Sequence, residues 1–211
     1  QAHLQSASVN VPQILAKDLT EGFLCLSDFG DVLLSDKLLP ENMQQFYSKA
    51  IATLEKVNFS SLSLADNLPE YDTAFIATEL MIFREWLLKE HLNIDLSEQE
   101  DKKLKTCFEY LSAAIIEQPQ VFMHRDYHCR NIMFLENEQL GIIDFQDAVK
   151  GPVIYDLVSL LRDCYVRWPD ELLEPLIESY RLKVQKHFLA ECLTREKWQY
   201  WFDLTGLQRH L

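Results

Sequence analysis

The sequence is poor in glycine and in positive charge, and each shortage narrows the range of folds and functions. Only 5 of the 211 residues are glycine, which argues against a β fold with many turns and favours a helix-rich one. Asp and Glu outnumber Lys and Arg by 33 to 20, so the formal net charge is −13. A nucleic-acid backbone would repel such a chain, and we expect no nucleic-acid partner.

Paired cysteines and long apolar runs are also missing. The five cysteines lie far apart, with no Cys-x-x-Cys pair: Cys25, Cys107, Cys129, Cys164 and Cys192. Scattered thiols are typical of a reducing compartment, so the sequence predicts a cytoplasmic protein without a disulfide framework or a zinc site. No apolar run approaches the roughly 18 residues that span a bilayer, and residues 1–10 lack the apolar core of a signal peptide. We expect no membrane partner.

Hydrophobic periodicity predicts short strands around a central polar loop and helices elsewhere. The expected strands are 11–18, 22–30, 121–124, 131–135 and 139–144, the last two forming a hairpin across the turn at 136–138. The expected helices are 44–57, 72–92, one from the Ser97–Glu100 capping box to Pro119, 155–168, 170–188 and 194–210. The pattern predicts buried faces at Phe46, Ala50, Leu54 and Val57, at Ile76, Leu80, Phe83 and Leu87, and at Leu104, Cys107 or Phe108, Leu111 and Ile115. The fold class is therefore a mostly helical α+β arrangement.

The polar loop lies in the stretch "VFMHRDYHCRNIMF", residues 121–134. Asn131 begins the outgoing strand of the predicted hairpin and Asp144 closes the returning one, so their side chains can approach one cation. An amide oxygen and a carboxylate are hard ligands, which suit Mg²⁺ held together with substrate phosphates. Asp126 is then free to accept a proton. This combination is what phosphoryl transfer requires.

These residues resemble a known family. "HRDYHCRN" resembles the H-x-D-x-x-x-x-N catalytic loop of kinases, and "IDFQDA" resembles their metal-binding strand. The continuation "DAVKGPVIYDLVSLLRD" is similar to the aminoglycoside phosphotransferase-like kinases, which have a protein-kinase-like fold. "ELMIFREWLL" and "TGLQRHL" make the chain most similar to the anomeric N-acetylmuramate/N-acetylglucosamine kinases of cell-wall recycling.

The resemblance implies an ATP- and Mg²⁺-dependent enzyme that transfers the γ-phosphate to the anomeric C1 hydroxyl of these sugars. It implies Asp126 as the base, and Asn131 and Asp144 as the metal ligands. Three further residues would support the loop: His124 and Arg125 by shaping it, and Asp156 by accepting its backbone N–H groups. Asp156 also has a simpler interpretation, as a carboxylate at a helix N-terminus.

Two expected parts of a kinase are missing from the sequence, a glycine-rich loop and a lysine that binds phosphates. In the family these parts precede the region where this chain begins, and the chain also stops at "QRHL" within a helical pattern, so we expect it to be truncated at both ends. Residues 1–30 would be a remnant of the N-lobe and hinge, and 31–211 the helical C-lobe with its catalytic hairpin. The backbone of Leu26, Ser27 and Asp28 would meet the adenine.

Candidate residues for the sugar come from three places: Glu79, Phe83 and Trp86 on a predicted helix face, Asp147 after "DFQ", and Arg209 near the end. Each also has an ordinary interpretation. The aromatic face could be core packing, Asp147 could cap a loop, and Arg209 could be a surface residue. An arginine fork would suit the carboxylate of N-acetylmuramate.

Two other functions remain open. The net charge of −13 would favour a polycation, as in an aminoglycoside or other amino-alcohol phosphotransferase. The absence of the phosphate-binding lysine is compatible with a non-catalytic kinase-like domain that binds a partner. The presence of Asp126, Asn131 and Asp144 argues against that second alternative.

Overall fold

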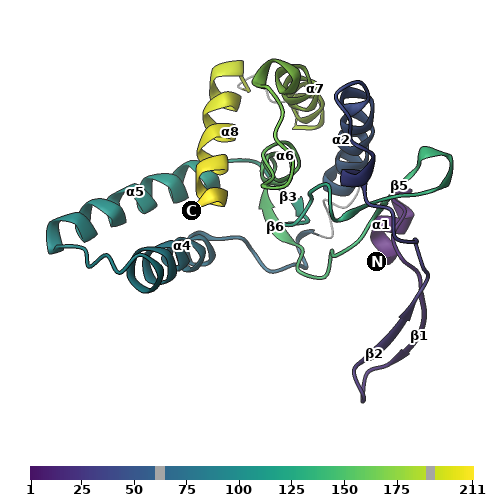
Figure 1. Cartoon of the computed structure of the whole chain (residues 1–211), viewed down its shortest axis with the longest axis horizontal. Helices are drawn as coiled ribbons and strands as arrows, with labels where there is room; N and C mark the ends of the chain where they lie inside the picture. The colour runs from purple at the N-terminus through teal and green to yellow at the C-terminus, as the bar shows by residue number, and fades with distance from the viewer. Residues whose placement is uncertain (60–64, 189–192) are drawn as a thin grey trace.

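The computed structural model describes residues 1–59, 65–188 and 193–211. Its helices are α1 (Ala2–Ser6), α2 (Met43–Phe59), α4 (Thr73–Ile82), α5 (Glu98–Ile116), α6 (Tyr155–Leu161), α7 (Asp170–Phe188) and α8 (Arg195–His210). Shorter turns are η1 (Leu34–Lys37) and η3 (Glu136–Glu138), and η2 (Phe83–His91) is π-helical. The strands are β1 (Ile14–Asp18), β2 (Phe23–Leu26), β3 (Gln120–Met123), β4 (Ile132–Phe134), β5 (Leu140–Ile142) and β6 (Val149–Pro152). The expected α+β class is confirmed (Figure 1).

The strands form antiparallel pairs rather than one sheet. β4 pairs with β5, with Met133 opposite Gly141, so the predicted hairpin is confirmed. β3 pairs instead with β6, a strand that the sequence pattern did not predict. After β3 the chain passes through the polar loop and then the β4–β5 hairpin. It then returns as β6 to pair with β3. This closed path brings Asp144 back beside the start of the loop.

Two apolar clusters support this arrangement. The larger one gathers α2, α6, α7 and α8, and the predicted face Phe46, Ala50, Leu54 and Val57 is fully part of it. The smaller one lies between α4, α5, β3 and β6. In Figure 1 the polar loop lies between the α4–α5 pair and the α2–α7 side of the molecule. The loop therefore rests on packed elements on both sides.

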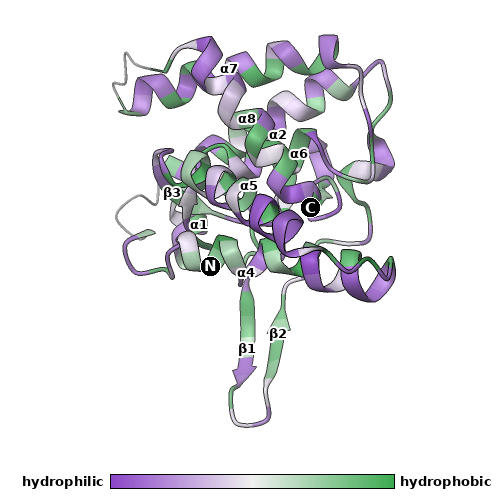
Figure 2. Cartoon of the chain, turned by 90° about the vertical axis from the view of Figure 1, so that its left-hand side faces the viewer, coloured by the Kyte–Doolittle hydropathy of each residue, from purple (hydrophilic) through white to green (hydrophobic). Residues whose placement is uncertain are grey.

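The β1–β2 hairpin projects away from the other elements (Figure 1). Its residues are exposed on both faces, and several are apolar: Ile14, Leu15, Leu19, Phe23, Leu24 and Leu26. Figure 2 shows this ribbon coloured as largely hydrophobic. The hairpin confirms the two strands expected near the N-terminus. The division into an N-lobe remnant and a C-lobe at residue 30 stays a prediction.

The expected helix 72–92 does not keep one winding. It is α-helical to Ile82 and continues as the π-helix η2, in which more residues fill each turn. Ile76 and Leu80 are buried as predicted. Leu87 is 39% exposed, so the prediction that it belongs to the buried face was wrong. The wider winding rotates residues after Phe83 away from the face that a 3.6-residue period assigns to them.

The expected helix 155–168 is also too long. α6 ends at Leu161, and the Asp163 carboxylate then accepts the backbone N–H groups of Tyr165 and Val166 in a turn. A short acidic side chain that bonds to the following backbone competes with helix continuation. In α5 the predicted Ser97–Glu100 capping box is present.

Phe108, rather than Cys107, belongs to the buried face of α5. The cysteines within the described residues are free, and Cys192 lies outside them. Across the described residues, no helix has the length and apolar character needed to cross a bilayer.

Candidate active site

His124 begins the polar loop and is completely buried. Its ring Nε2 lies 3.0 Å from the carbonyl oxygen of Ile143, the residue before Asp144. This contact ties the start of the loop to the end of the hairpin. Burial lowers the pKa of His124 to about 4, against the opposing effect of the Ile143 carbonyl. The ring is therefore neutral at physiological pH, and Nε2–H donates to Ile143.

Asp156, in the first turn of α6, fixes the backbone of the loop. One carboxylate oxygen accepts the N–H of His124 at 2.8 Å, and the other accepts the N–H of Arg125 at 3.0 Å. Asp156 is fully buried, and this burial raises its pKa to about 6 although both N–H bonds favour the ionised form. The contact expected for Asp156 is thus present, and its catalytic importance stays a prediction.

Two buried residues behind Asp156 were missed by the sequence analysis. Asn58 of α2 donates to the Phe122 carbonyl at 2.7 Å and lies 3.4 Å from Asp156. Tyr180 of α7 donates its hydroxyl to the Asn58 amide oxygen. The only sequence signal for Asn58 was a polar residue next to the apolar face of a helix. The chain Tyr180–Asn58–Asp156 connects the helical core to the loop.

Arg125 holds a strained conformation. Its φ is 77°, in the left-handed region, which costs a residue other than glycine roughly 1–3 kcal/mol. Asp144, two residues after the end of β5, has a φ of 65°. Such strain persists only where the surroundings determine the backbone, and these two residues flank the predicted site.

Asn131 and Asp144 face one another, as the hairpin predicts. The Asn131 amide nitrogen lies 3.2 Å from an Asp144 carboxylate oxygen and 3.0 Å from the Asp126 carbonyl. Gln146 donates to the other Asp144 oxygen at 2.7 Å. The Asp126 carboxylate is half-buried and accepts no hydrogen bond from any residue that the structure describes. The loop therefore presents one uncommitted carboxylate beside an amide–carboxylate pair.

The donor set fits a divalent cation shared with a substrate. The described residues contain no cluster of three or more His, Cys, Asp or Glu side chains able to bind a metal alone. Asp144 and the amide oxygen of Asn131 supply two hard oxygens, which is the number that Mg²⁺ commonly takes from a protein when phosphates and waters complete its octahedron. The residues present thus fit Mg²⁺ bound together with a nucleotide.

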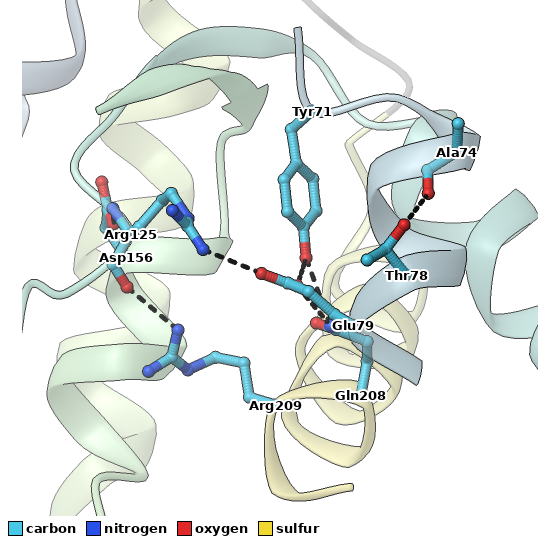
Figure 3. Close-up of polar contacts among 8 residues, drawn as sticks. All are labelled: Tyr71, Ala74, Thr78, Glu79, Arg125, Asp156, Gln208 and Arg209. Atoms are coloured by element: carbon cyan, nitrogen blue, oxygen red, sulfur yellow. Dashed lines mark hydrogen bonds and ion pairs between the residues drawn. The ribbon is translucent and has the colours of Figure 1, made fainter. Parts of the chain in front are cut away.

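A second polar network adjoins the loop on the side of α4 and α8 (Figure 3). One Glu79 oxygen pairs with the Arg125 guanidinium at 3.0 Å, and the other accepts from Tyr71 and, at 3.1 Å, from Gln208. Arg209 donates to the Arg125 carbonyl at 3.0 Å. Burial would lower the pKa of Arg125, but the Glu79 charge outweighs it and raises that pKa. Glu79 and Arg209, both expected to meet a sugar, are thus engaged with the loop.

The remaining sugar candidates are more scattered. Phe83 packs edge-to-face on Phe108 of α5, with 6.4 Å between ring centroids. Trp86 lies in η2 and is 66% exposed, and Asp147 is exposed after β5. Their roles stay predictions.

The residues predicted to form the hinge, Leu26, Ser27 and Asp28, lie at the end of β2 and directly after it. The Ser27 N–H donates to the Gln13 carbonyl, and the Ser27 hydroxyl accepts the Gln13 N–H, both at 2.8 Å. The Asp28 carboxylate accepts the N–H of Gly30. These contacts fix the backbone of this segment, and its role as a hinge in contact with adenine stays a prediction.

A polar loop opposite a hairpin, with a free carboxylate beside a facing amide–carboxylate pair, is the arrangement expected of one class, the phosphotransferases of the kinase-like fold. Comparison with protein families agrees: the model of the "Phosphotransferase enzyme family" matches residues 1–192. The chain belongs to this family.

Curated relatives narrow the comparison. The chain is 38% identical over 208 residues to the N-acetylmuramate/N-acetylglucosamine kinase of Pseudomonas aeruginosa, covering 99% of this chain and 61% of that protein. It is 34% identical over 205 residues to the kinase of the same name from Neisseria meningitidis, covering 96% of this chain and 61% of that protein. The chain therefore spans about 61% of the length of these two relatives.

Solved structures share the fold. An aminoglycoside phosphotransferase in complex with gentamicin superposes with a TM-score of 0.62 at 18% identity, covering 98% of this chain and 67% of that one. A choline/ethanolamine kinase family protein from Mesorhizobium loti gives a TM-score of 0.58 at 14% identity, covering 99% and 70%. At these identities the likeness concerns the fold alone.

Proposed function

We propose that the protein is an ATP-dependent kinase that phosphorylates the anomeric C1 hydroxyl of N-acetylmuramate and N-acetylglucosamine. One observation carries the chemistry: the uncommitted Asp126 carboxylate lies on a fixed loop beside the facing pair Asn131 and Asp144. The sugar assignment rests on two relatives that carry this name and match nearly all of the chain.

In this proposal each residue has one task. Asp126 accepts the proton of the sugar hydroxyl as its oxygen attacks the γ-phosphorus of ATP. Asn131 and Asp144 hold Mg²⁺, which when bound neutralises phosphate charge. Asp156 and His124 fix the loop backbone, because positioning supplies much of the rate in phosphoryl transfer. Leu26, Ser27 and Asp28 present backbone groups to adenine.

The test uses the full-length protein that carries this chain. With ATP, Mg²⁺ and either sugar, Asp126→Ala should lower kcat by about 10²–10⁴-fold while ATP binding persists. Asp95→Asn, an exposed carboxylate in the turn before α5, is the matched control and should keep the wild-type rate. Equal kcat in wild type and Asp126→Ala would remove the base from the mechanism.

The product identifies the substrate class. Phosphorus NMR should show a phosphate on the anomeric carbon. A phosphate on C6 would be consistent with a sugar kinase but would refute its assignment as an anomeric kinase of cell-wall recycling. Turnover of kanamycin without turnover of either amino sugar would instead establish an aminoglycoside phosphotransferase, and ATP binding without turnover of any acceptor would indicate a non-catalytic domain. The cytoplasmic location belongs to this proposal, because both sugar and ATP must reach the site.

A further inference from the structure

Arg125 immediately precedes Asp126, so its conformation directs the proposed base. Its left-handed φ of 77° is one that an arginine does not adopt without outside support. Three groups hold it: Asp156 accepts its N–H, Arg209 donates to its carbonyl and Glu79 binds its guanidinium, each at 3.0 Å. The first contact comes from α6, whereas the other two come from α8 and α4.

Each of the last two contacts is itself supported. The Arg125 guanidinium lies 4.9 Å from the centre of the Phe75 ring of α4, and the Arg209 guanidinium lies 4.5 Å from that of Tyr155 in α6. Cations over aromatic rings are stabilised and oriented by the ring face. Buried Tyr71 and Gln208 orient the second oxygen of Glu79 (Figure 3). The network is therefore built to hold Arg125 from two helices at once.

We propose that Glu79 and Arg209 are positioning residues, which hold Arg125 in its left-handed conformation and thereby orient the side chain of Asp126. This inference rests on the proposed function, since it assigns them a task in that reaction. It differs from the expectation that both bind the sugar directly. It also makes the spacing of α4 and α8 a determinant of loop geometry.

Glycine gives a direct test, because it adopts positive φ without strain. In the wild type and in the Arg125→Ala background, Arg209→Ala should lower kcat by roughly tenfold or more with little change in the sugar KM, since Asp126 is no longer held in position. With Arg125→Gly as the background, the same substitution should change kcat by less than about threefold, because the loop no longer needs support. Arg209→Lys keeps a donor and should restore much of the loss.

Glu79→Gln follows the same logic. It should lower kcat when residue 125 is arginine and have little effect in the Arg125→Gly background, because the guanidinium it binds is then gone. Arg195→Ala is the matched control, an arginine on the same helix α8 whose side chain is 75% exposed. It should leave kcat unchanged. A rise in the KM for N-acetylmuramate alone, equal in all backgrounds, would assign Arg209 to the sugar carboxylate and overturn the proposal.

Amide hydrogen exchange gives a readout that does not need activity. Arg209→Ala should speed exchange of the backbone N–H groups of residues 124 and 125 by roughly tenfold in the otherwise wild-type protein, and barely in the Arg125→Gly variant. Unchanged exchange in the otherwise wild-type protein would overturn the positioning role. Failure of the wild type to phosphorylate either sugar would refute the proposed function instead, and the exchange experiment would still decide the role of Arg209.

Discussion

Acid should destabilise the fold through His124. The ring is completely buried, Nε2 faces the Ile143 carbonyl, and Nδ1 has no partner among the described residues. Protonation would place a proton on Nδ1 with no acceptor for it. Its pKa is about 4 in the folded protein and 6.5 in the reference state. A folded-state pKa below the unfolded one means that the stabilising contribution is complete above pH 6.5 and is lost as the pH falls toward 4.

The size of the loss follows from these two values. The fall in pKa from 6.5 to about 4, at about 1.36 kcal/mol per pH unit, gives about 3 kcal/mol lost by pH 4, where the folded ring is half protonated. Asp156 acts in the opposite sense, because its pKa of about 6 lies above the reference value of 3.8 and its contribution grows as the pH falls. Only a comparison that keeps Asp156 constant can therefore isolate His124.

His124→Gln provides that comparison, because a glutamine amide can still donate to Ile143 and does not titrate. Urea unfolding at pH 8 should show the variant about 1–2 kcal/mol less stable, since the packed ring is lost. Between pH 8 and pH 4 the free energy of unfolding of the variant should gain about 3 kcal/mol relative to that of the wild type. The two plots of unfolding free energy against pH should therefore cross. His210→Gln, at an exposed position, is the control and should follow the wild type. Parallel curves for His124→Gln and wild type would refute the reasoning.

Three further substitutions test the packing and capping contacts of the fold by equilibrium unfolding. Asn58→Ala should cost about 2–4 kcal/mol, because the Phe122 carbonyl and the Tyr180 hydroxyl lose a buried partner; a cost below about 1 kcal/mol would contradict this. Gly141→Ala should cost about 1–3 kcal/mol, because an added Cβ would lie 2.6 Å from the Phe29 ring, and wild-type stability would show that Phe29 moves freely. Ser97→Ala should cost about 1 kcal/mol through the lost N-cap of α5, and no loss would mean that the end of that helix is already frayed.

The parts of the site that sequence analysis predicted are local in the chain. Asp126 and Asn131 lie five residues apart in one loop, and a short hairpin brings Asp144 to Asn131. A turn flanked by apolar strands is enough to predict that approach. The buried face of α2 could be predicted equally well, because a regular helix repeats its buried positions with a fixed period.

The parts that were missed depend on contacts between distant segments. Asn58 and Tyr180 meet across 122 positions, and nothing near either residue indicates the other. β6 forms because β3 offers it an edge, although "VKGP" contains both Gly and Pro. Glu79 and Arg209 were predicted as sugar ligands, and that role stays a prediction. Their contacts with the Arg125 guanidinium and backbone were not predicted, because they depend on a φ angle that no sequence pattern indicates.

The projecting β1–β2 ribbon has a practical consequence for handling this chain. A two-stranded ribbon leaves an open row of amide and carbonyl groups along each outer edge, and this one also carries Leu15, Phe23 and Leu24 in contact with water. Such an edge recruits another strand, so copies of the chain should self-associate as the concentration rises. Light scattering over a dilution series of this chain would reveal it as a particle mass that rises with concentration.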